Sequence, residues 1–339
     1  MIVEAIGKVT RHSSLSLSEA TGVMEEIMGG EATDAQIASF ITGLRMKGET
    51  VEEISGFASV MRAKAARVRP KVPEVVDTCG TGGDGANTFN ISTAAAFVVA
   101  GAGVAIAKHG NRSVSSKSGS ADVLERLGVE IALPAAAVEL CIEEVGIGFM
   151  FAPVMHAAMK HAIGPRKEIA IRTVFNILGP LCNPALAGAQ VMGVYDPELL
   201  PVMAGVLSNL GVRHALVVHG EPGMDELSNA GNTVVAELKD GEIRRYETTP
   251  EEAGLSRAEP AEISGGDPEE NAAILRSVLE GEPGPRRDVV LLNAAAALKA
   301  ADKAPDLAAG VAMAAEAIDS GAAAGKLEGL VELSRRLAQ

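Results

Sequence analysis

The sequence is poor in aromatic residues: it has no tryptophan, two tyrosines and seven phenylalanines among 339 residues. Hydrophobic residues nevertheless make up 47% of the chain, so the interior must be filled mainly by Ala, Val, Leu, Ile and Met. Alanine-rich helices fit this composition. The length allows two domains, or one large α/β domain with a smaller accessory part.

Cysteine is also scarce. The three cysteines, Cys79, Cys141 and Cys182, are odd in number, widely spaced and without a C-x-x-C pair. This pattern argues against a disulfide framework and against a zinc site. The N-terminus has an early acid, Glu4, and no later segment is an uninterrupted apolar span. We therefore expect no export signal, no membrane span and a cytoplasmic location.

Positive charge is in deficit, with Lys+Arg 30 against Asp+Glu 44 and a formal net charge of -14. Nucleic acid and anionic membranes would repel such a chain, so we expect neither as a partner. An anionic small molecule would need a local basic pocket. Candidate cations for such a pocket occur at Lys108, His109, Arg112, Lys117 and Arg166–Lys167.

The N-terminal part of the chain, up to about residue 65, has apolar residues at helical spacing. Three segments fit the capping box, in which a hydroxyl and a carboxylate or amide satisfy the first amides of a helix. They begin at Ser16, Thr33 and Thr50, and glycines at 29–30 and 48 stand where the first two helices should end.

An alternation of strands and helices follows. We predict a strand at 74–77, a helix from Ser92 or Thr93 to Gly101, a strand at 104–107 and a helix at 121–127. This order is typical of a parallel sheet whose loops at the carboxyl ends of the strands hold a ligand. Further along we expect a strand at 215–218, a hairpin of 233–238 with 242–246, and three alanine-rich helices after about residue 268.

The turn after the first strand, Asp77–Gly85, contains four glycines and Asp84. It formally matches G-x-G-x-x-G, but a dinucleotide site would need a helix at its third glycine and an acid after the next strand. Here the helix starts later and Lys108 follows the next strand. A tight turn without a ligand remains an alternative. Asn90, Ser92 and Thr93 favour a phosphate site, because they exceed what one helix cap requires.

The segment from Lys108 to Ser120 combines three cations with five serines, the last placed to cap a helix. This composition favours anion binding over a merely solvated loop. Asp225–Glu226 follows a buried strand and could hold Mg²⁺ together with substrate phosphates, although such a pair alone is usually solvated surface. His156 is as consistent with a structural role as with a catalytic one. Arg166 suits a planar carboxylate.

Several segments together resemble the anthranilate phosphoribosyltransferases, in the structural class that includes pyrimidine nucleoside phosphorylases. The segments are Asp77–Gly85, Asn90–Thr93, Lys108–Arg112, Arg166, Arg172–Pro184 and Val218–Ser228. The resemblance implies transfer of the 5-phosphoribosyl group from phosphoribosyl pyrophosphate (PRPP) to the amine of anthranilate, with release of pyrophosphate, in tryptophan biosynthesis. Because the amine of anthranilate is neutral at pH 7, we expect no single indispensable nucleophile or base.

The resemblance also implies site residues, carried over position by position. Those implied for PRPP are Gly80, Gly83, Asp84, Thr88, Asn90, Ile91, Ser92, Thr93, Lys108, His109, Gly110, Asn111, Arg112, Ser113, Val114, Ser115, Ser116 and Ser120. Those implied for anthranilate are Gly80, His109, Asn111, Arg166 and Pro180. Those implied for Mg²⁺, with two ions expected, are Ser92, Asp225 and Glu226.

The implied fold is a small N-terminal helical domain on a larger α/β domain with a central, mostly parallel sheet. We expect the helical domain at 1–70, with a returning segment at about 166–186 that forms a hinge, and the donor-binding domain at 71–339. The resemblance further implies a homodimer formed through the helical domain. Two departures from the family pattern affect local backbone geometry: Ala157 stands where proline is frequent, and Ala170 where glycine is common.

Two other functions remain open. A pyrimidine nucleoside phosphorylase would share the architecture but use inorganic phosphate without a divalent metal, so Asp225–Glu226 speaks against it. A relative that binds a ligand or nucleic acid without turnover would show no product, and the acidic charge disfavours its nucleic-acid form.

Overall fold

The computed structural model describes residues 1–113 and 117–339. Within these residues the chain forms a seven-stranded sheet in the order β3-β2-β1-β4-β5-β6-β7. The first five strands are parallel, and β6 and β7 are antiparallel. The strands are β1 (Val76–Gly80), β2 (Ile106–Gly110), β3 (Ile147–Phe151), β4 (Ala189–Gly193), β5 (His214–Gly220), β6 (Thr233–Lys239) and β7 (Glu242–Thr248). The predicted fold class, a helical part beside a mostly parallel sheet, is confirmed.

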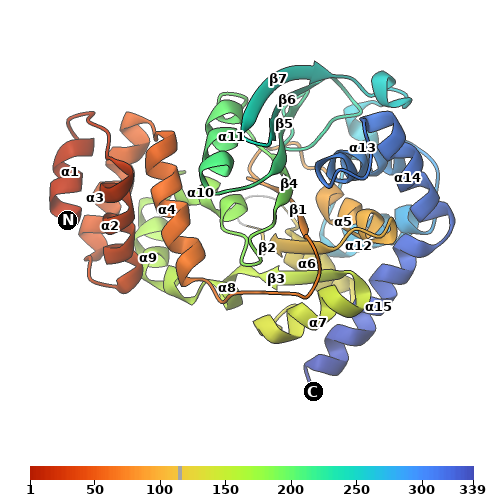
Figure 1. The fold of residues 1–339 in the computed structure, drawn as a ribbon, viewed down its shortest axis with the longest axis horizontal. Helices are drawn as coiled ribbons and strands as arrows, with labels where there is room; N and C mark the ends of the chain where they lie inside the picture. The colour runs from red at the N-terminus through yellow and green to blue at the C-terminus, as the bar shows by residue number, and fades with distance from the viewer. Residues whose placement is uncertain (114–116) are drawn as a thin grey trace.

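The N-terminal helices lie at one end of the molecule (Figure 1). They are α1 (Ile2–Val9), α2 (Leu17–Gly29), α3 (Asp34–Lys47) and α4 (Val51–Lys64). All three predicted capping boxes are present with both of their hydrogen bonds, at Ser16, Thr33 and Thr50. Gly30 ends α2 in the left-handed conformation and Gly48 ends α3, as expected.

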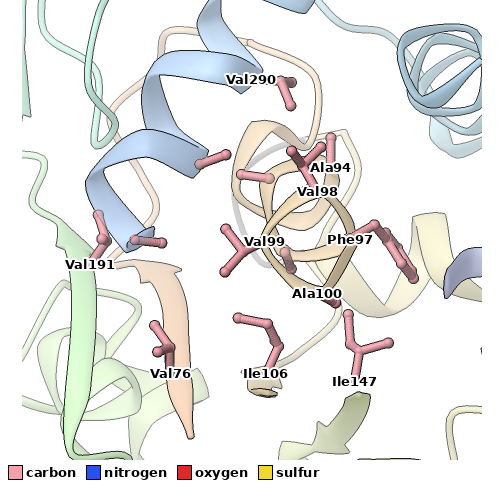
Figure 2. Packing of buried hydrophobic residues seen from close by; sticks show 14 of the residues in the cluster. Val76, Ala94, Phe97, Val98, Val99, Ala100, Ile106, Ile147, Val191 and Val290 are labelled. Atoms are coloured by element: carbon pink, nitrogen blue, oxygen red, sulfur yellow. The ribbon is translucent and has the colours of Figure 1, made fainter. Parts of the chain in front are cut away.

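One face of the sheet packs against α5 (Ile91–Gly101), a helix of small and branched apolar residues. Figure 2 shows Phe97, Val98 and Val99 of this helix among side chains from several strands. The neighbours include Val76, Ile106, Ile147 and Val191, with Val290 from α13 (Pro285–Ala300). Alanines in α5 and α13 replace the missing aromatics, because small side chains let helices approach the sheet closely.

The opposite face of the sheet packs with the N-terminal helices. Residues alternate along the strands: Val191 and Leu216 belong to the first core, whereas Met192 and Val217 belong to the second. The second core also contains side chains of α2 to α4, of α9 (Lys160–Ile169) and of α11 (Leu199–Asn209). The helical part and this face of the sheet therefore share one core.

The strand boundaries differ from the sequence-based ones. The predicted strand 74–77 is β1, which runs to Gly80, and 104–107 is β2, which runs to Gly110. Lys108 and His109 therefore lie in a strand rather than in a loop. Both residues are near the carboxyl end of β2, where the strand reaches the edge of the sheet. Strands β3 and β4 were not predicted, whereas the hairpin β6–β7 is confirmed.

The C-terminal region forms four helices where three were predicted. They are α12 (Pro268–Leu279), α13, α14 (Leu307–Asp319) and α15 (Ala322–Leu337). The missed break lies before Asp306, whose side chain accepts a hydrogen bond from Ala309 N and begins α14. In the part of the chain that the structure describes, no single helix has the length and apolar character to cross a membrane, although α14 and α15 together pass that test across a 61° bend.

The remaining elements connect these layers. Helices α6 (Ser120–Leu127) and α7 (Ala135–Val145) lie between β2 and β3, and α8 (Ala152–Met155) and α10 (Phe175–Leu178) lie between β3 and β4. Short 3₁₀ turns occur at Ala157–Met159, Gly179–Leu181, Glu251–Ala253 and Pro260–Ile263. Gly128 ends α6 in the left-handed conformation.

Candidate active site

Four of the parallel strands end in glycine at the same edge of the sheet. They are β1, β2, β4 and β5, which end at Gly80, Gly110, Gly193 and Gly220. The backbone of Asp225 and Glu226 crosses this edge in close contact. A Cβ on Gly193 would lie 1.5 Å from Asp225 O, and one on Gly220 would lie 2.6 Å from Glu226 O. Glycine is therefore required at both positions by space.

The Asp225–Glu226 segment is fixed by two hydrogen bonds at Leu227, the residue that follows it. Leu227 N donates to Asn293 Oδ1 at 3.0 Å, and Asn293 Nδ2 donates back to Leu227 O at 2.9 Å. The carboxylates point into the predicted phosphate-binding region: Gly82 N donates to Asp225 Oδ2 at 2.6 Å, and Ser92 N donates to Glu226 Oε1 at 3.3 Å. The structure thus joins segments about 130 to 145 residues apart in sequence.

The carboxylates at this edge have strongly perturbed acidities. Burial, with the nearby charge of Asp84, raises the pKa of Asp225 to about 7. Burial and the charge of Asp225 raise the pKa of Glu226 well above its usual range. Asp84 Oδ2 also accepts a hydrogen bond from Asp225 N at 3.2 Å. Three neighbouring carboxyl groups that repel one another form a site in which a cation would be stabilised.

These residues fit a magnesium site of the open kind. Across residues 1–113 and 117–339, no group of three His, Cys, Asp or Glu side chains is placed to hold a metal ion without other ligands. Mg²⁺ commonly takes one or two carboxylates and completes its coordination with water and substrate phosphates. Asp225, Glu226 and the Ser92 hydroxyl provide oxygen donors of this type.

The glycine turn after β1 has an unusual backbone. Gly82, Gly83 and Gly85 have φ of 67°, 75° and 76°, in the left-handed region that favours glycine. Asp84 Oδ1 accepts a hydrogen bond from Ala86 N at 3.3 Å, which stabilises the turn locally. Gly80 is the last residue of β1, so the turn projects directly from the sheet edge.

The start of α5 differs from the prediction. The N-cap residue is Asn90, not Ser92 or Thr93, and its side chain makes no cap hydrogen bond. Asn90 instead accepts from Ser118 Oγ at 3.2 Å and from Asn271 Nδ2 at 3.1 Å. Ser92 Oγ accepts from Lys108 Nζ. The Asn90 side chain therefore does not cap α5; Ser92 N donates to the Glu226 carboxylate instead, and Thr93 N donates to Asn90 O.

Thr88 and Ile91 flank this helix start. Thr88 forms an isolated β-bridge with Ser264, and Ile91 is fully buried beneath the site. The Thr93 hydroxyl is buried and, among the described residues, has no hydrogen-bond partner.

Lys108 is buried under the site rather than exposed in a loop. Its Nζ donates to Thr78 O at 2.5 Å and to Ser92 Oγ at 3.3 Å. Burial lowers the pKa of Lys108, while the charge of Asp77 opposes this shift. Asp77 accepts from Asn183 Nδ2 at 2.8 Å, and burial raises its pKa. Hydrogen bonds to Thr78 of β1 and Ser92 of α5 therefore fix the position of the lysine side chain.

Two histidines lie together at the neighbouring position. The rings of His109 and His156 have centroids 5.0 Å apart, and His109 Nδ1 is 3.2 Å from Gly179 O. Within the described residues, both Nε2 atoms are buried without a hydrogen-bond partner. Burial lowers the pKa of His109 to about 3 and that of His156 to about 4. Both imidazoles are therefore neutral in this environment.

Arg112 does not project as a free cation. It forms ion pairs at 2.9 Å with both Asp122 and Glu125 of α6. Asp122 also accepts from Ser113 N at 3.0 Å and from Gly119 N at 2.9 Å. These contacts attach the segment after β2 to the first turn of α6.

Ser120 is the first residue of α6 rather than its cap, because Gly119 holds the N-cap position. Its hydroxyl donates to Asn111 O at 3.4 Å, and a Cβ on Gly110 would lie 2.1 Å from Ser120 Oγ. Gly110, Asn111 and Ser120 are thus brought together. The predicted contacts Val114, Ser115 and Ser116 lie outside the described residues.

Arg166 lies in α9, which packs on the helical part, with its guanidinium 5.1 Å from the centroid of the Phe175 ring. Burial lowers its pKa. Pro180 is in the short turn after α10, next to the Gly179 carbonyl that faces His109. In the described parts of the chain, no hydrogen bond or ion pair joins Arg166 to His109, Asn111 or Pro180.

Sequence reasoning assigned no role to several residues that shape the site. Asn183 bridges Asp77 and Ala107 O, and Asn293 fixes the acidic segment from α13. Asn183 belongs to the Arg172–Pro184 segment and Asp77 is an acid in an apolar strand, so both offered a signal. Asn293 offered none, since it is one polar residue in an apolar helix.

The comparisons with known proteins cover nearly the whole chain. A family model described as "Glycosyl transferase family, a/b domain" matches residues 72–324, and one described as "Glycosyl transferase family, helical bundle domain" matches residues 3–65. A curated relative from Symbiobacterium thermophilum, named anthranilate phosphoribosyltransferase, is 58% identical and covers 97% of each chain.

Two solved structures are similar in fold and length. Anthranilate phosphoribosyltransferase from Thermus thermophilus has a TM-score of 0.93 and 47% identity, covering 98% of this chain and 99% of its own. The Saccharomyces cerevisiae enzyme, solved in complex with PRPP and Mg, has a TM-score of 0.90 and 29% identity, covering 99% and 98%. The family resemblance predicted from the sequence is confirmed, and the chain belongs to the anthranilate phosphoribosyltransferase family.

Proposed function

We propose that this chain transfers the 5-phosphoribosyl group from PRPP to the amine of anthranilate, giving N-(5-phosphoribosyl)anthranilate and pyrophosphate, in tryptophan biosynthesis. The observation that carries the proposal is the cluster of Asp84, Asp225 and Glu226 beside the glycine turn and the start of α5. Full-length relatives of this name, one of them solved with PRPP and Mg, support it.

The chemistry requires stabilisation of the leaving group more than activation of the nucleophile. Anthranilate's amine is neutral at pH 7, so no strong side-chain base is needed to expose its lone pair. As the C1–O bond breaks, negative charge grows on pyrophosphate and positive charge on the ribose. Positioned donors that face the developing negative charge lower this barrier.

The donor site uses the turn and the strand ends. Amides of the glycine turn that do not donate to Asp225 would face the phosphates, and the buried Lys108 would add positive charge near them. Ser92, Asp225 and Glu226 would hold Mg²⁺, with two ions expected. When bound, magnesium neutralises the charge of the leaving diphosphate. The other residues that the sequence analysis assigned to PRPP would make the remaining contacts with the donor.

The acceptor site lies between the strand ends and the returning segment. Arg166 would bind the anthranilate carboxylate, and Gly80, His109, Asn111 and Pro180 would surround the ring. Because burial keeps His109 neutral, it adds no charge that would compete with Arg166 for the carboxylate. The stacked contact of Arg166 on Phe175 holds the guanidinium plane.

The organisation of the chain follows the same proposal. The helical domain would span 1–70 with the returning segment at about 166–186, and the donor-binding domain 71–339; the two family-model ranges support this division. Exposed apolar side chains at Val3, Leu17 and Met46 support a homodimer formed through the helical part. Three unpaired cysteines support a cytoplasmic location.

The experiment is a fluorescence assay of purified protein with PRPP, Mg²⁺ and anthranilate. Loss of anthranilate fluorescence that depends on both PRPP and Mg²⁺ is expected. A relative that only binds ligands would show no such loss. The phosphorylase alternative is tested with thymidine or uridine and inorganic phosphate in EDTA; cleavage there, without transfer to anthranilate, would replace the proposal.

A paired carboxamide variant tests the metal assignment. Asp225→Asn with Glu226→Gln should raise the Mg²⁺ concentration needed for half-maximal rate by at least about tenfold, because two anionic ligands become neutral. The matched control, Asp240→Asn with Glu242→Gln, removes two charges from the tip of the β6–β7 hairpin and should change nothing. An unchanged Mg²⁺ dependence in the first variant removes the assignment.

A further inference from the structure

Arg172 lies between the end of α9 and the start of α10, in the segment that joins the helical part to the sheet. Its guanidinium carbon is 4.3 Å from the centroid of the Tyr195 ring. Tyr195 follows β4, and its backbone N donates to Thr81 Oγ1 at 3.1 Å. The arginine and the glycine turn therefore share one support, the residue Tyr195.

The same guanidinium lies directly on Gly83. A Cβ at residue 83 would be 1.1 Å from Arg172 Nη2 and 2.3 Å from its Cζ, so only glycine leaves room for the contact. At Gly82, whose φ of 67° is close to the 75° of Gly83, an added Cβ would meet nothing within 4 Å. An added Cβ would therefore meet the arginine at Gly83 and open space at Gly82.

The charge of Arg172 is otherwise unused. Throughout the described ranges, 1–113 and 117–339, no carboxylate or carbonyl forms a hydrogen bond or ion pair with it, whereas Arg112 and Arg213 both pair with acids. Stacking occupies a face of the guanidinium and leaves its N–H edge available. At the preceding residue of the turn, Gly82 N donates to Asp225 Oδ2.

We propose that Arg172 is a positioning residue for the diphosphate of the donor: stacked on Tyr195, it holds Gly83, while Asp225 holds the neighbouring Gly82, so that the turn stays in place for the phosphates. The inference rests on the proposed binding of PRPP at this turn. Through Arg172, the segment after α9 directly contacts the backbone of the glycine turn. A displacement of that segment would therefore also move the turn.

A double-mutant cycle tests the contact. Gly83→Ala and Gly82→Ala both place alanine at positive φ, but only the first displaces Arg172. Gly83→Ala should raise KM for PRPP more than Gly82→Ala does, by on the order of tenfold, since misplaced binding groups cost this much or more. With Arg172→Ala as the background, that excess should vanish. An excess that persists undiminished overturns the proposal.

Arg172→Lys separates positioning from simple charge. Lysine keeps the positive charge but lacks the planar group that stacks on Tyr195 and covers Gly83. The KM for PRPP should therefore rise nearly as much as in Arg172→Ala, with the KM for anthranilate unchanged. Wild-type PRPP kinetics in Arg172→Lys, or an effect confined to anthranilate, would contradict the proposal.

A readout without turnover distinguishes this inference from the proposed function. The chain has two tyrosines, Tyr195 and Tyr246, so ring signals of ¹³C-labelled tyrosine can be assigned with Tyr246→Phe. Arg172→Ala and Gly83→Ala should both shift the Tyr195 signal, and Gly82→Ala should not. If these signals shift as expected but the wild type does not transfer the phosphoribosyl group to anthranilate, the proposed function is wrong and the contact between Arg172 and Gly83 is supported. If the wild type transfers the group but the Tyr195 signal does not move in either variant, the contact alone is wrong.

Discussion

Gly80 and Asp225 are in such close contact that a Cβ on residue 80 would lie 2.2 Å from Asp225 Oδ2. Gly80→Ala should therefore push the Asp225 carboxylate away from the end of β1. We expect a destabilisation of about 1–3 kcal/mol from overpacking, and a larger loss of Mg²⁺-dependent activity. Thermal unfolding and the Mg²⁺ dependence of the rate measure the two effects separately.

The matched control for this substitution is Gly325→Ala in α15. A Cβ there would meet nothing within 4 Å, and the site is an exposed helix interior. Alanine should stabilise that helix by about 0.5–1 kcal/mol and leave the kinetics unchanged. If Gly80→Ala behaved like Gly325→Ala, the tight contact between Gly80 and Asp225 would be wrong.

Arg166→Ala should mainly weaken the use of anthranilate. Removing a charged partner of a carboxylate raises KM for anthranilate by roughly 10-fold to 100-fold, because charge-assisted hydrogen bonds contribute about 1.5–3 kcal/mol. KM for PRPP should change little. Lys167→Ala is the control, since it removes the adjacent, exposed cation of the same helix. Equal kinetics in the two variants would remove Arg166 from the acceptor site.

The elements that could be predicted were those with local signals. The capping boxes at Ser16, Thr33 and Thr50 specify hydrogen bonds within four residues, and all three are present. The parallel sheet followed from alternating apolar segments. The ends of β1 and β2 could not be read in this way, because the polar residues Thr78 and Lys108 are buried by contacts with distant segments.

The residue types of the candidate site were also predictable, whereas their contacts were not. Asp225–Glu226 was recognisable as a metal-binding candidate beside a predicted phosphate site, and Asp84 as part of the glycine turn. That Lys108 would donate to Ser92, and that Arg112 would pair with Asp122 and Glu125, depends on side-chain packing in three dimensions. Arg172 gave no sequence signal for Gly83, since 89 residues separate them.

His156 provides a prediction about pH. Burial lowers its pKa to about 4, from 6.5 in the unfolded chain, so the unfolded state binds more protons between these values. Its contribution to stability is therefore present above pH 6.5 and is lost as pH falls towards 4, by up to about 3 kcal/mol. His156→Gln lacks this titration.

The measurement is the thermal midpoint of both proteins between pH 4 and 7.5. The wild type should lose stability more steeply than His156→Gln as the pH falls, while the buried carboxyl groups contribute equally to both. The comparison concerns the slope, because glutamine in the same cavity can shift the midpoint at every pH. Parallel curves would show that His156 is not held neutral by burial.

Ala170 ends α9 with φ 52° and ψ 29°, a left-handed conformation that is costly for alanine. Ala170→Gly should relieve about 1–2 kcal/mol of strain, against about 0.4–1 kcal/mol of added entropy in the unfolded chain, for a net gain of up to about 1.5 kcal/mol. Ala35→Gly, an exposed position in the right-handed helix α3, is the control and should lower the thermal midpoint. Because Ala170 lies two residues before Arg172, unchanged PRPP kinetics in Ala170→Gly would show that alanine's strain is not needed to place the guanidinium. A lower midpoint in Ala170→Gly would contradict the left-handed backbone at this position.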